Sequence, residues 1–86
     1  MTRSLLLVVE DDAEMRSVVA FTLRNYGYEV REAATGSDAL SQIQTRTPDA
    51  MELDLGLPDM DGFVVTACVR QEHEFPIIIL SARGEE

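Results

Sequence analysis

The chain has 86 residues, 45% of them hydrophobic, and a formal net charge of -9, which together describe one small globular domain. This charge disfavours direct binding to nucleic acid or anionic lipid and favours cations and basic protein surfaces. The single cysteine, Cys68, excludes an internal disulfide and a cysteine metal cluster and suits a reducing compartment. The apolar run Leu5–Val9 is too short for a membrane span or a signal-peptide core, so we expect a cytoplasmic protein.

A strand and a helix are predicted at the start of the chain. Leu5–Val9 is continuously apolar, as is typical of strands covered on both faces. A helix is predicted over 13–26, because Asp12 can cap its first turn and Gly27 suits the left-handed conformation after its last turn. At helical spacing, one face of this helix carries Met15, Val18, Val19, Thr22 and Tyr26.

The middle of the chain repeats this order. A second strand is predicted over Glu29–Ala33 and a second helix over 37–46. Thr35 followed by Asp38 matches a capping box at the start of this helix. An apolar stripe of Ala39, Leu40 and Ile43 is expected to pack on the sheet.

The last part adds a third strand over 50–53, a third helix over 63–70 and a fourth strand over 76–80. Strict alternation of strands and helices predicts a parallel α/β sheet. The fourth strand, like the first, is continuously apolar, which again predicts coverage on both faces.

Acidic residues stand where the predicted strands end. Glu10 and Asp11 follow the first strand, Asp54 follows the third, and Ser81 follows the fourth. These groups should meet, because parallel strands deliver their carboxyl ends to one edge. Carboxylates about 4 Å apart repel by about 1 kcal/mol even in water, and a divalent cation relieves that repulsion. Oxygen ligands of this kind suit Mg²⁺.

A metal beside a spare carboxylate indicates phosphoryl transfer, with Asp54 as the nucleophile and Ser81 as a hydrogen-bond donor to the product. A plainer interpretation makes residues 10–12 a solvated strand end and helix cap. Asp54 argues against that interpretation, because an unpaired carboxylate between Leu53 and Leu55 is costly to bury.

The segment 56–62 is predicted to form a tight loop at the rim of this site. Pro58 fixes its own backbone, and Gly62 permits unusual dihedral angles.

Three motifs resemble the receiver domains of two-component response regulators. They are Val8-Val9-Glu10-Asp11-Asp12, Leu53-Asp54-Leu55-Gly56-Leu57-Pro58-Asp59-Met60-Asp61-Gly62 and Leu80-Ser81-Ala82-Arg83. The resemblance covers the whole chain. The segments 32–36 and 76–84 resemble the Kdp-type, OmpR-like regulators of potassium-transport genes.

The resemblance implies a phosphorelay module and not an enzyme. Asp54 would accept a phosphoryl group from a sensor histidine kinase, and Ser81 would be the switch hydroxyl. Mg²⁺ would be held by Asp11 and Asp54 directly, by Glu10 through water, and by the backbone carbonyl of Gly56.

The fold that the resemblance implies is a flavodoxin-like, doubly wound parallel sheet with strand order 2-1-3-4. Residues 1–86 would form a partial receiver domain. It would lack the fourth helix, the fifth strand with its phosphate-contacting lysine, and the fifth helix. The winged-helix DNA-binding domain of Kdp-type relatives would be absent as well, so we expect no direct DNA binding.

Some residues depart from the family pattern. Glu52 stands at an aliphatic position of the central strand, where a charge is expensive to bury. Val64, Ala67 and Cys68 make the outer face of the third helix more apolar, which suggests an added contact surface. An uncovered fourth strand would also be a template for pairing with another chain, so we expect self-association.

Other functions remain open at this point. The chain could be an interaction or dimerisation module that is not phosphorylated, in which case partner binding would not need Mg²⁺. A phosphohydrolase is disfavoured, because such enzymes place an acid two residues after the nucleophile, where this chain has Gly56. Nucleotide binding is excluded, because the turn after the first strand is acidic where a glycine-rich turn is needed.

Overall fold

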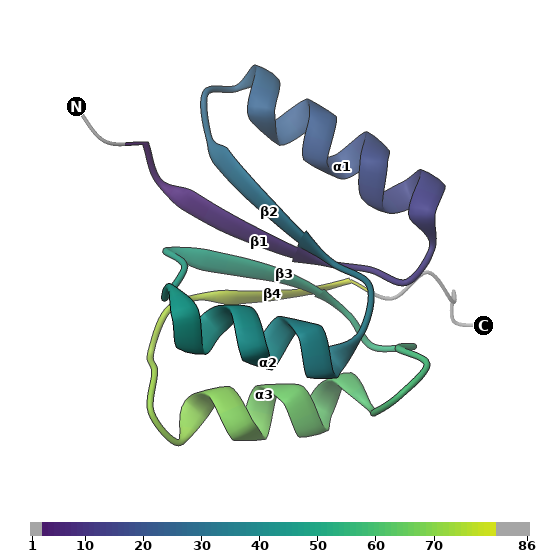
Figure 1. Cartoon of the computed structure of the whole chain (residues 1–86), viewed down its shortest axis with the longest axis vertical. Helices are drawn as coiled ribbons and strands as arrows, with labels where there is room; N and C mark the ends of the chain where they lie inside the picture. The colour runs from purple at the N-terminus through teal and green to yellow at the C-terminus, as the bar shows by residue number, and fades with distance from the viewer. Residues whose placement is uncertain (1–2, 81–86) are drawn as a thin grey trace.

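The computed structural model describes residues 3–80 as one four-stranded parallel sheet with helices on both faces (Figure 1). The strands are β1 (Leu5–Val9), β2 (Glu29–Ala33), β3 (Ala50–Asp54) and β4 (Ile77–Leu80), and the helices are α1 (Ala13–Asn25), α2 (Gly36–Thr45) and α3 (Gly62–Arg70). The strand order is β2-β1-β3-β4, and every neighbouring pair is parallel. The predicted fold class and strand order are confirmed.

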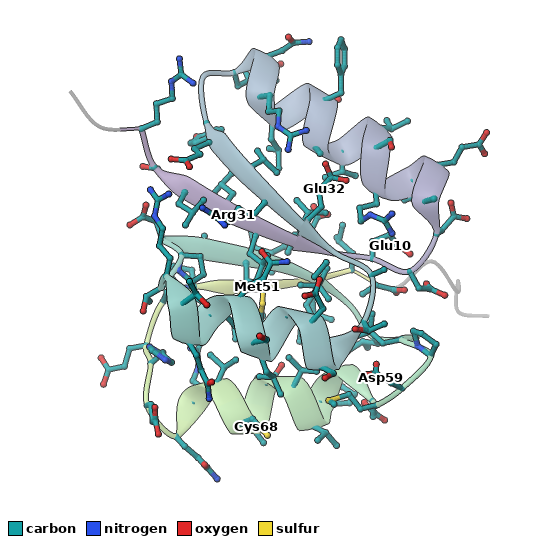
Figure 2. All side chains as sticks on the ribbon, viewed as in Figure 1. Glu10, Arg31, Glu32, Met51, Asp59 and Cys68 are labelled. Carbon is teal, nitrogen blue, oxygen red and sulfur yellow. The ribbon has the colours of Figure 1, made fainter. Side chains whose placement is uncertain are left out.

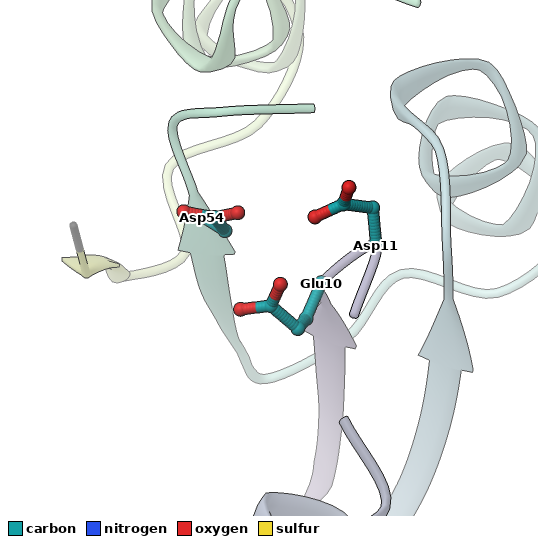
Figure 3. A group of neighbouring side chains, drawn as sticks. All are labelled: Glu10, Asp11 and Asp54. Atoms are coloured by element: carbon teal, nitrogen blue, oxygen red, sulfur yellow. The ribbon is translucent and has the colours of Figure 1, made fainter. Parts of the chain in front are cut away.

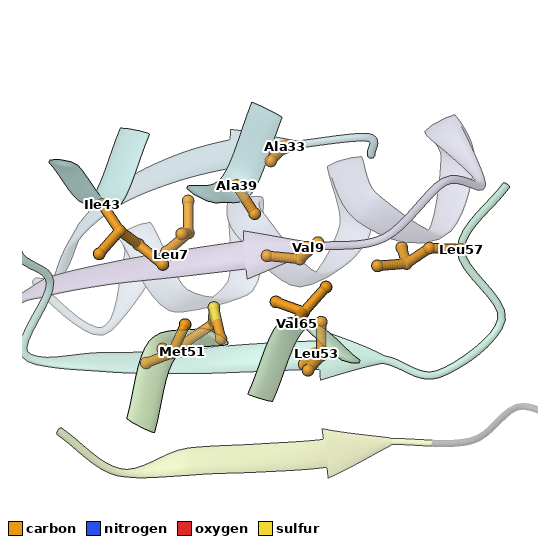
Figure 4. Close-up of a cluster of buried hydrophobic side chains, with 10 residues drawn as sticks. Leu7, Val9, Ala33, Ala39, Ile43, Met51, Leu53, Leu57 and Val65 are labelled. Carbon is orange, nitrogen blue, oxygen red and sulfur yellow. The ribbon is translucent and has the colours of Figure 1, made fainter. Parts of the chain in front are cut away.

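The core lies mainly between the sheet and the pair α2 and α3. Alternate strand residues point to this side and are buried with residues of both helices (Figure 4). This larger cluster contains Leu7, Val9, Ala33, Ala39, Ile43, Met51, Leu53, Leu57, Val65 and Val69. A smaller cluster of Val8, Ala20 and Val30 joins α1 to the other face. Both faces of β1 are therefore covered, which explains its continuous apolar run.

The helix ends follow the predicted capping chemistry, with one exception. Asp12 accepts a hydrogen bond from the Met15 N–H at 3.0 Å, and Gly27 has a left-handed φ of 95° after α1. Thr35 caps α2 by accepting from the Asp38 N–H at 3.0 Å. The Asp38 carboxylate, however, accepts from the Gln42 side chain at 3.1 Å. Only the Thr35 half of the predicted capping box is therefore observed among residues 3–80.

The face of α1 that the helical spacing marks is mostly exposed. Met15, Val18 and Tyr26 are exposed by 50%, 60% and 78%, and the residues that pack on the sheet are Ala20 with Val19 and Leu23. That apolar stripe lies one flank away from the contact face, because α1 packs mainly over β2 and β1. An apolar flank of α1 consequently faces solvent.

The prediction that β4 is covered on both faces is also wrong. Ile77 is packed against the core, whereas Ile78, Ile79 and Leu80 are 57%, 40% and 47% exposed. β4 is the last strand of the sheet among the described residues. The expectation of an exposed aliphatic edge is therefore met in the described part of the chain. On α3, Val64, Ala67 and Cys68 are exposed as predicted.

Candidate functional site

Three carboxylates meet at the carboxyl edge of the sheet, as the sequence predicts (Figure 3). Glu10, Asp11 and Asp54 each place one carboxylate oxygen within 4.8 Å of the others. Asp54 is the last residue of β3, and Glu10 and Asp11 follow β1 directly. The side chains of Glu10 and Asp54 are half-buried, while Asp11 is exposed. Such a group of oxygen ligands at an open edge suits a hard divalent cation.

Backbone and side-chain hydrogen bonds fix Glu10 at the end of β1. Its N–H donates to the Ala33 carbonyl of β2 at 3.0 Å, and its carboxylate accepts from the Asp12 N–H at 3.0 Å. Asp12 itself caps α1. The acidic triplet therefore divides into two roles: Asp12 is structural, as the plainer interpretation held, while Glu10 and Asp11 belong to the cluster.

Arg16 is a supporting residue that the sequence analysis missed. Its guanidinium donates to the Glu10 carbonyl at 2.8 Å and pairs with Glu32 of β2 at 3.4 Å. Arg24 pairs with the same Glu32 at 3.2 Å, so one carboxylate of β2 joins both arginines of α1. Glu32 and Glu10 are labelled in Figure 2. The spacing of Arg16 and Arg24, two helical turns apart, could have indicated a shared face.

The electrostatics of the cluster are unfavourable without a cation. Burial raises the pKa of Glu10, and the neighbouring carboxylates of Asp54 and Asp11 raise it further, against a lowering by the Asp12 N–H. None of the salt bridges within residues 3–80 involves Glu10, Asp11 or Asp54. The protein therefore concentrates negative charge here without a basic side chain paired to it in the described region.

The loop between β3 and α3 packs tightly under the site. A β-carbon on Gly62 would lie 2.8 Å from Leu55 Cδ2, 2.9 Å from Leu55 Cα and 3.2 Å from the Asp54 carbonyl oxygen. Among the described residues only Gly27 has a positive φ, so the expectation of unusual dihedral angles at Gly62 is wrong. Glycine is needed there for close approach to the strand end. The adjacent Asp61 caps α3 by accepting from the Phe63 N–H at 2.8 Å.

The predicted roles of two further site residues, Gly56 and Ser81, stay predictions. Gly56 lies in the exposed part of this loop, two residues after Asp54, and its role as a carbonyl ligand is untested. Ser81 lies outside the described residues. Leu80, which precedes it, is the register partner of Asp54 in the β3 and β4 pair.

A doubly wound parallel sheet with an acidic cluster at its carboxyl edge is the arrangement expected of a receiver domain. The chain belongs to the response regulator receiver domain family, whose model matches residues 6–86. It is 43% identical over 81 residues to the KDP operon transcriptional regulatory protein KdpE of Escherichia coli, covering 94% of this chain and 36% of that protein. The predicted Kdp-type resemblance is thereby confirmed.

Two other comparisons agree. The transcriptional regulatory protein AfsQ1 of Streptomyces coelicolor is 38% identical over 81 residues, covering 94% of this chain and 36% of AfsQ1. The structure of the chemotaxis response regulator CheY4 of Vibrio cholerae superposes with a TM-score of 0.92 at 33% identity, covering 98% of this chain and 72% of CheY4. The chain thus spans about a third of the two regulators. No helix within residues 3–80 has the length and apolar character needed to cross a membrane.

Proposed function

We propose that Asp54 accepts a phosphoryl group from a sensor histidine kinase, with Mg²⁺ bound by the carboxylates around it. The observation that carries the proposal is the convergence of Glu10, Asp11 and Asp54, with carboxylate oxygens within 4.8 Å of one another. Membership of the receiver family supports it. These domains are signalling modules, and we propose that the chain is a substrate of the kinase and not an enzyme with a turnover of its own.

The residues fit a Mg²⁺ ion. Asp11 and Asp54 would bind it directly, Glu10 through a water molecule, and Gly56 through its carbonyl oxygen. Burial and the nearby carboxylates of Asp54 and Asp11 raise the pKa of Glu10. A bound cation would offset these effects. When bound, Mg²⁺ neutralises negative charge on the transferring phosphoryl oxygens.

The chain's own residues perform the rest of the transfer. A carboxylate oxygen of Asp54 attacks phosphorus, a new P–O bond forms, and the P–N bond to the kinase histidine breaks, leaving its electron pair on the imidazole nitrogen. Half-burial of Asp54 at the strand end holds this oxygen at the open edge of the sheet. Ser81 would then donate a hydrogen bond to a phosphoryl oxygen. In longer relatives this change would switch transcription.

The partners follow from charge and surface. A chain with a net charge of -9 suits a basic kinase surface and disfavours DNA and anionic membranes. We place the protein in the cytoplasm, where such kinases present their phosphorylated histidine. A second copy is also a partner in this proposal, because β4 offers an exposed aliphatic edge.

One observation favours a second function, that of an interaction module without phosphorylation. The exposed apolar residues of α1 and α3, which include Met15, Val18, Phe63 and Val64, provide contact surface in addition to the acidic cluster. If this function were the main one, partner binding would be independent of Mg²⁺ and of Asp54.

The test compares the 86-residue chain with its Asp54→Asn variant in the presence of Mg²⁺ and acetyl phosphate or beryllofluoride. We expect intact mass to increase by one phosphoryl group in the wild type only, and Mg²⁺-dependent NMR shifts with beryllofluoride to disappear in the variant. A folded, soluble wild type that shows neither response would contradict phosphoacceptor function and favour the interaction module.

A further inference from the structure

The β3–α3 loop is attached to the start of α2 by one carboxylate, that of Asp59 (Figure 2). Asp59 Oδ1 accepts from the Gly36 N–H at 2.8 Å, and Oδ2 accepts from the Ser37 N–H at 2.9 Å. Both N–H groups belong to the first turn of α2, where backbone donors have no partner within the helix. A side chain more than 20 residues away in sequence supplies that partner.

In this contact the Asp59 carboxylate is a charged acceptor at the positive N-terminal end of α2. Hydrogen bonds from the backbone of Ser37 and Gly36 lower the pKa of Asp59. The α2 N-terminus favours a negative charge for the same reason. Thr35 already caps the Asp38 N–H, so Asp59 completes the set of acceptors and adds a connection that an ordinary cap does not make.

Packing reinforces the same contact. A β-carbon on Gly36 would lie 2.5 Å from Met60 Cγ, 2.8 Å from Met60 Sδ and 3.0 Å from Val65 Cγ2. Gly36 is buried, and Met60 packs against the main core. The loop residue next to Asp59 therefore lies directly on the first residue of α2, and a β-carbon at position 36 would push the Met60 side chain away.

Both ends of the loop segment that carries Gly56 are consequently held. Asp54 fixes its start in β3, the Gly62 N–H donates to the Leu55 carbonyl at 3.2 Å, and Asp59 fixes its middle on α2. Ordering a backbone residue costs about 1 to 2 kcal/mol. An attachment present before a ligand arrives means that this cost does not reduce the affinity for the ligand.

We propose that Asp59 is a positioning residue for the acidic site, which acts by holding residues 56–60 against α2 so that the Gly56 carbonyl lies in place for the metal. The inference rests on the proposed Mg²⁺ site. Loss of the Asp59 carboxylate should weaken Mg²⁺ binding by about tenfold, the lower end of what is typical for outer-shell partners of metal ligands.

The experiment is a Mg²⁺ titration of the full 86-residue chain by NMR, with folding of every variant checked by circular dichroism. The variants are Asp59→Asn, Asp59→Glu and Gly36→Ala, and the matched control is Asp38→Asn. Asp38 is also an exposed first-turn carboxylate of α2, but it bonds Gln42 and not the loop. The control therefore reproduces the change in net charge without touching the loop.

We expect the Mg²⁺ Kd to rise about tenfold in Asp59→Asn and in Gly36→Ala, with shifts at the Gly56 amide before metal is added. Asp59→Glu should restore part of the affinity, and Asp38→Asn should bind as the wild type does. The double variant Gly36→Ala/Asp59→Asn should be little worse than either single change, because both break one contact.

The outcomes separate this inference from the proposed function. Wild-type affinity in folded Asp59→Asn and Gly36→Ala overturns the positioning role and leaves the Mg²⁺ site intact. An equal loss in Asp38→Asn also overturns it, because the effect would then be one of net charge. A wild type that binds no Mg²⁺ overturns the proposed site and the positioning role together.

Discussion

Glu52 is a carboxylate in the middle of β3, between Met51 and Leu53, which are both buried. It points to the opposite side of the sheet, where it is half-buried in register with Val8 and Ile78. Burial raises its pKa. A carboxylate with a raised folded-state pKa binds its proton more tightly when folded, so folding is favoured at low pH and this contribution is lost as pH rises.

Glu52→Gln should therefore stabilise the fold at neutral pH. We expect a gain of roughly 1 kcal/mol or less at pH 7, reduced by solvent screening because the site is only half-buried. The gain should vanish below about pH 4.5, the ordinary value for this carboxyl. Urea unfolding at several pH values measures this difference. Glu72→Gln, on the exposed surface, is the control, and a gain that does not change with pH would contradict the explanation.

At the scale of elements, the proposed self-association depends on β4. Ile78 is 57% exposed on this edge strand, and unpaired strand edges with aliphatic side chains favour pairing with another copy. Ile78→Lys should weaken self-association by about tenfold or more, because a charge on an edge strand opposes pairing. Sedimentation over a range of concentrations measures this change.

The control for this prediction is Val64→Lys. Val64 is 50% exposed on the outer face of α3, so the variant makes the same charge change at similar exposure away from the edge. Equal effects of the two substitutions would show that the β4 edge does not govern association, and that net charge or the outer face of α3 contributes as much. A wild type that stays monomeric at all concentrations would contradict the self-association proposal itself.

For the molecule as a whole, local sequence patterns predicted the elements and a parallel sheet, while the strand order followed from the resemblance to receiver domains. Apolar runs and capping residues predicted every strand and helix, and the end of each strand predicted the meeting of Glu10, Asp11 and Asp54. Sequence could not predict which flank of α1 is buried, because Val18 and Val19 are equally apolar and only the position of α1 over β1 and β2 separates them. The contact of Asp59 with Gly36 was likewise missed, since it joins residues 23 apart with no local pattern.

The last prediction is that Mg²⁺ stabilises the fold by more than its screening of the net charge can explain. A ligand that binds only the folded state at ten times its Kd adds about 1.4 kcal/mol, which for a domain of this size corresponds to roughly 6 to 11 °C in Tm. Sodium chloride at equal ionic strength screens the net charge of -9 without occupying the site, so it should give a smaller rise. Thermal unfolding of the wild type and Asp54→Asn in both salts separates the two effects. The extra rise in Tm with Mg²⁺ should be lost in the variant, because one carboxylate of the cluster is then neutral. An equal rise in Tm in both salts for both proteins would leave screening as the whole explanation.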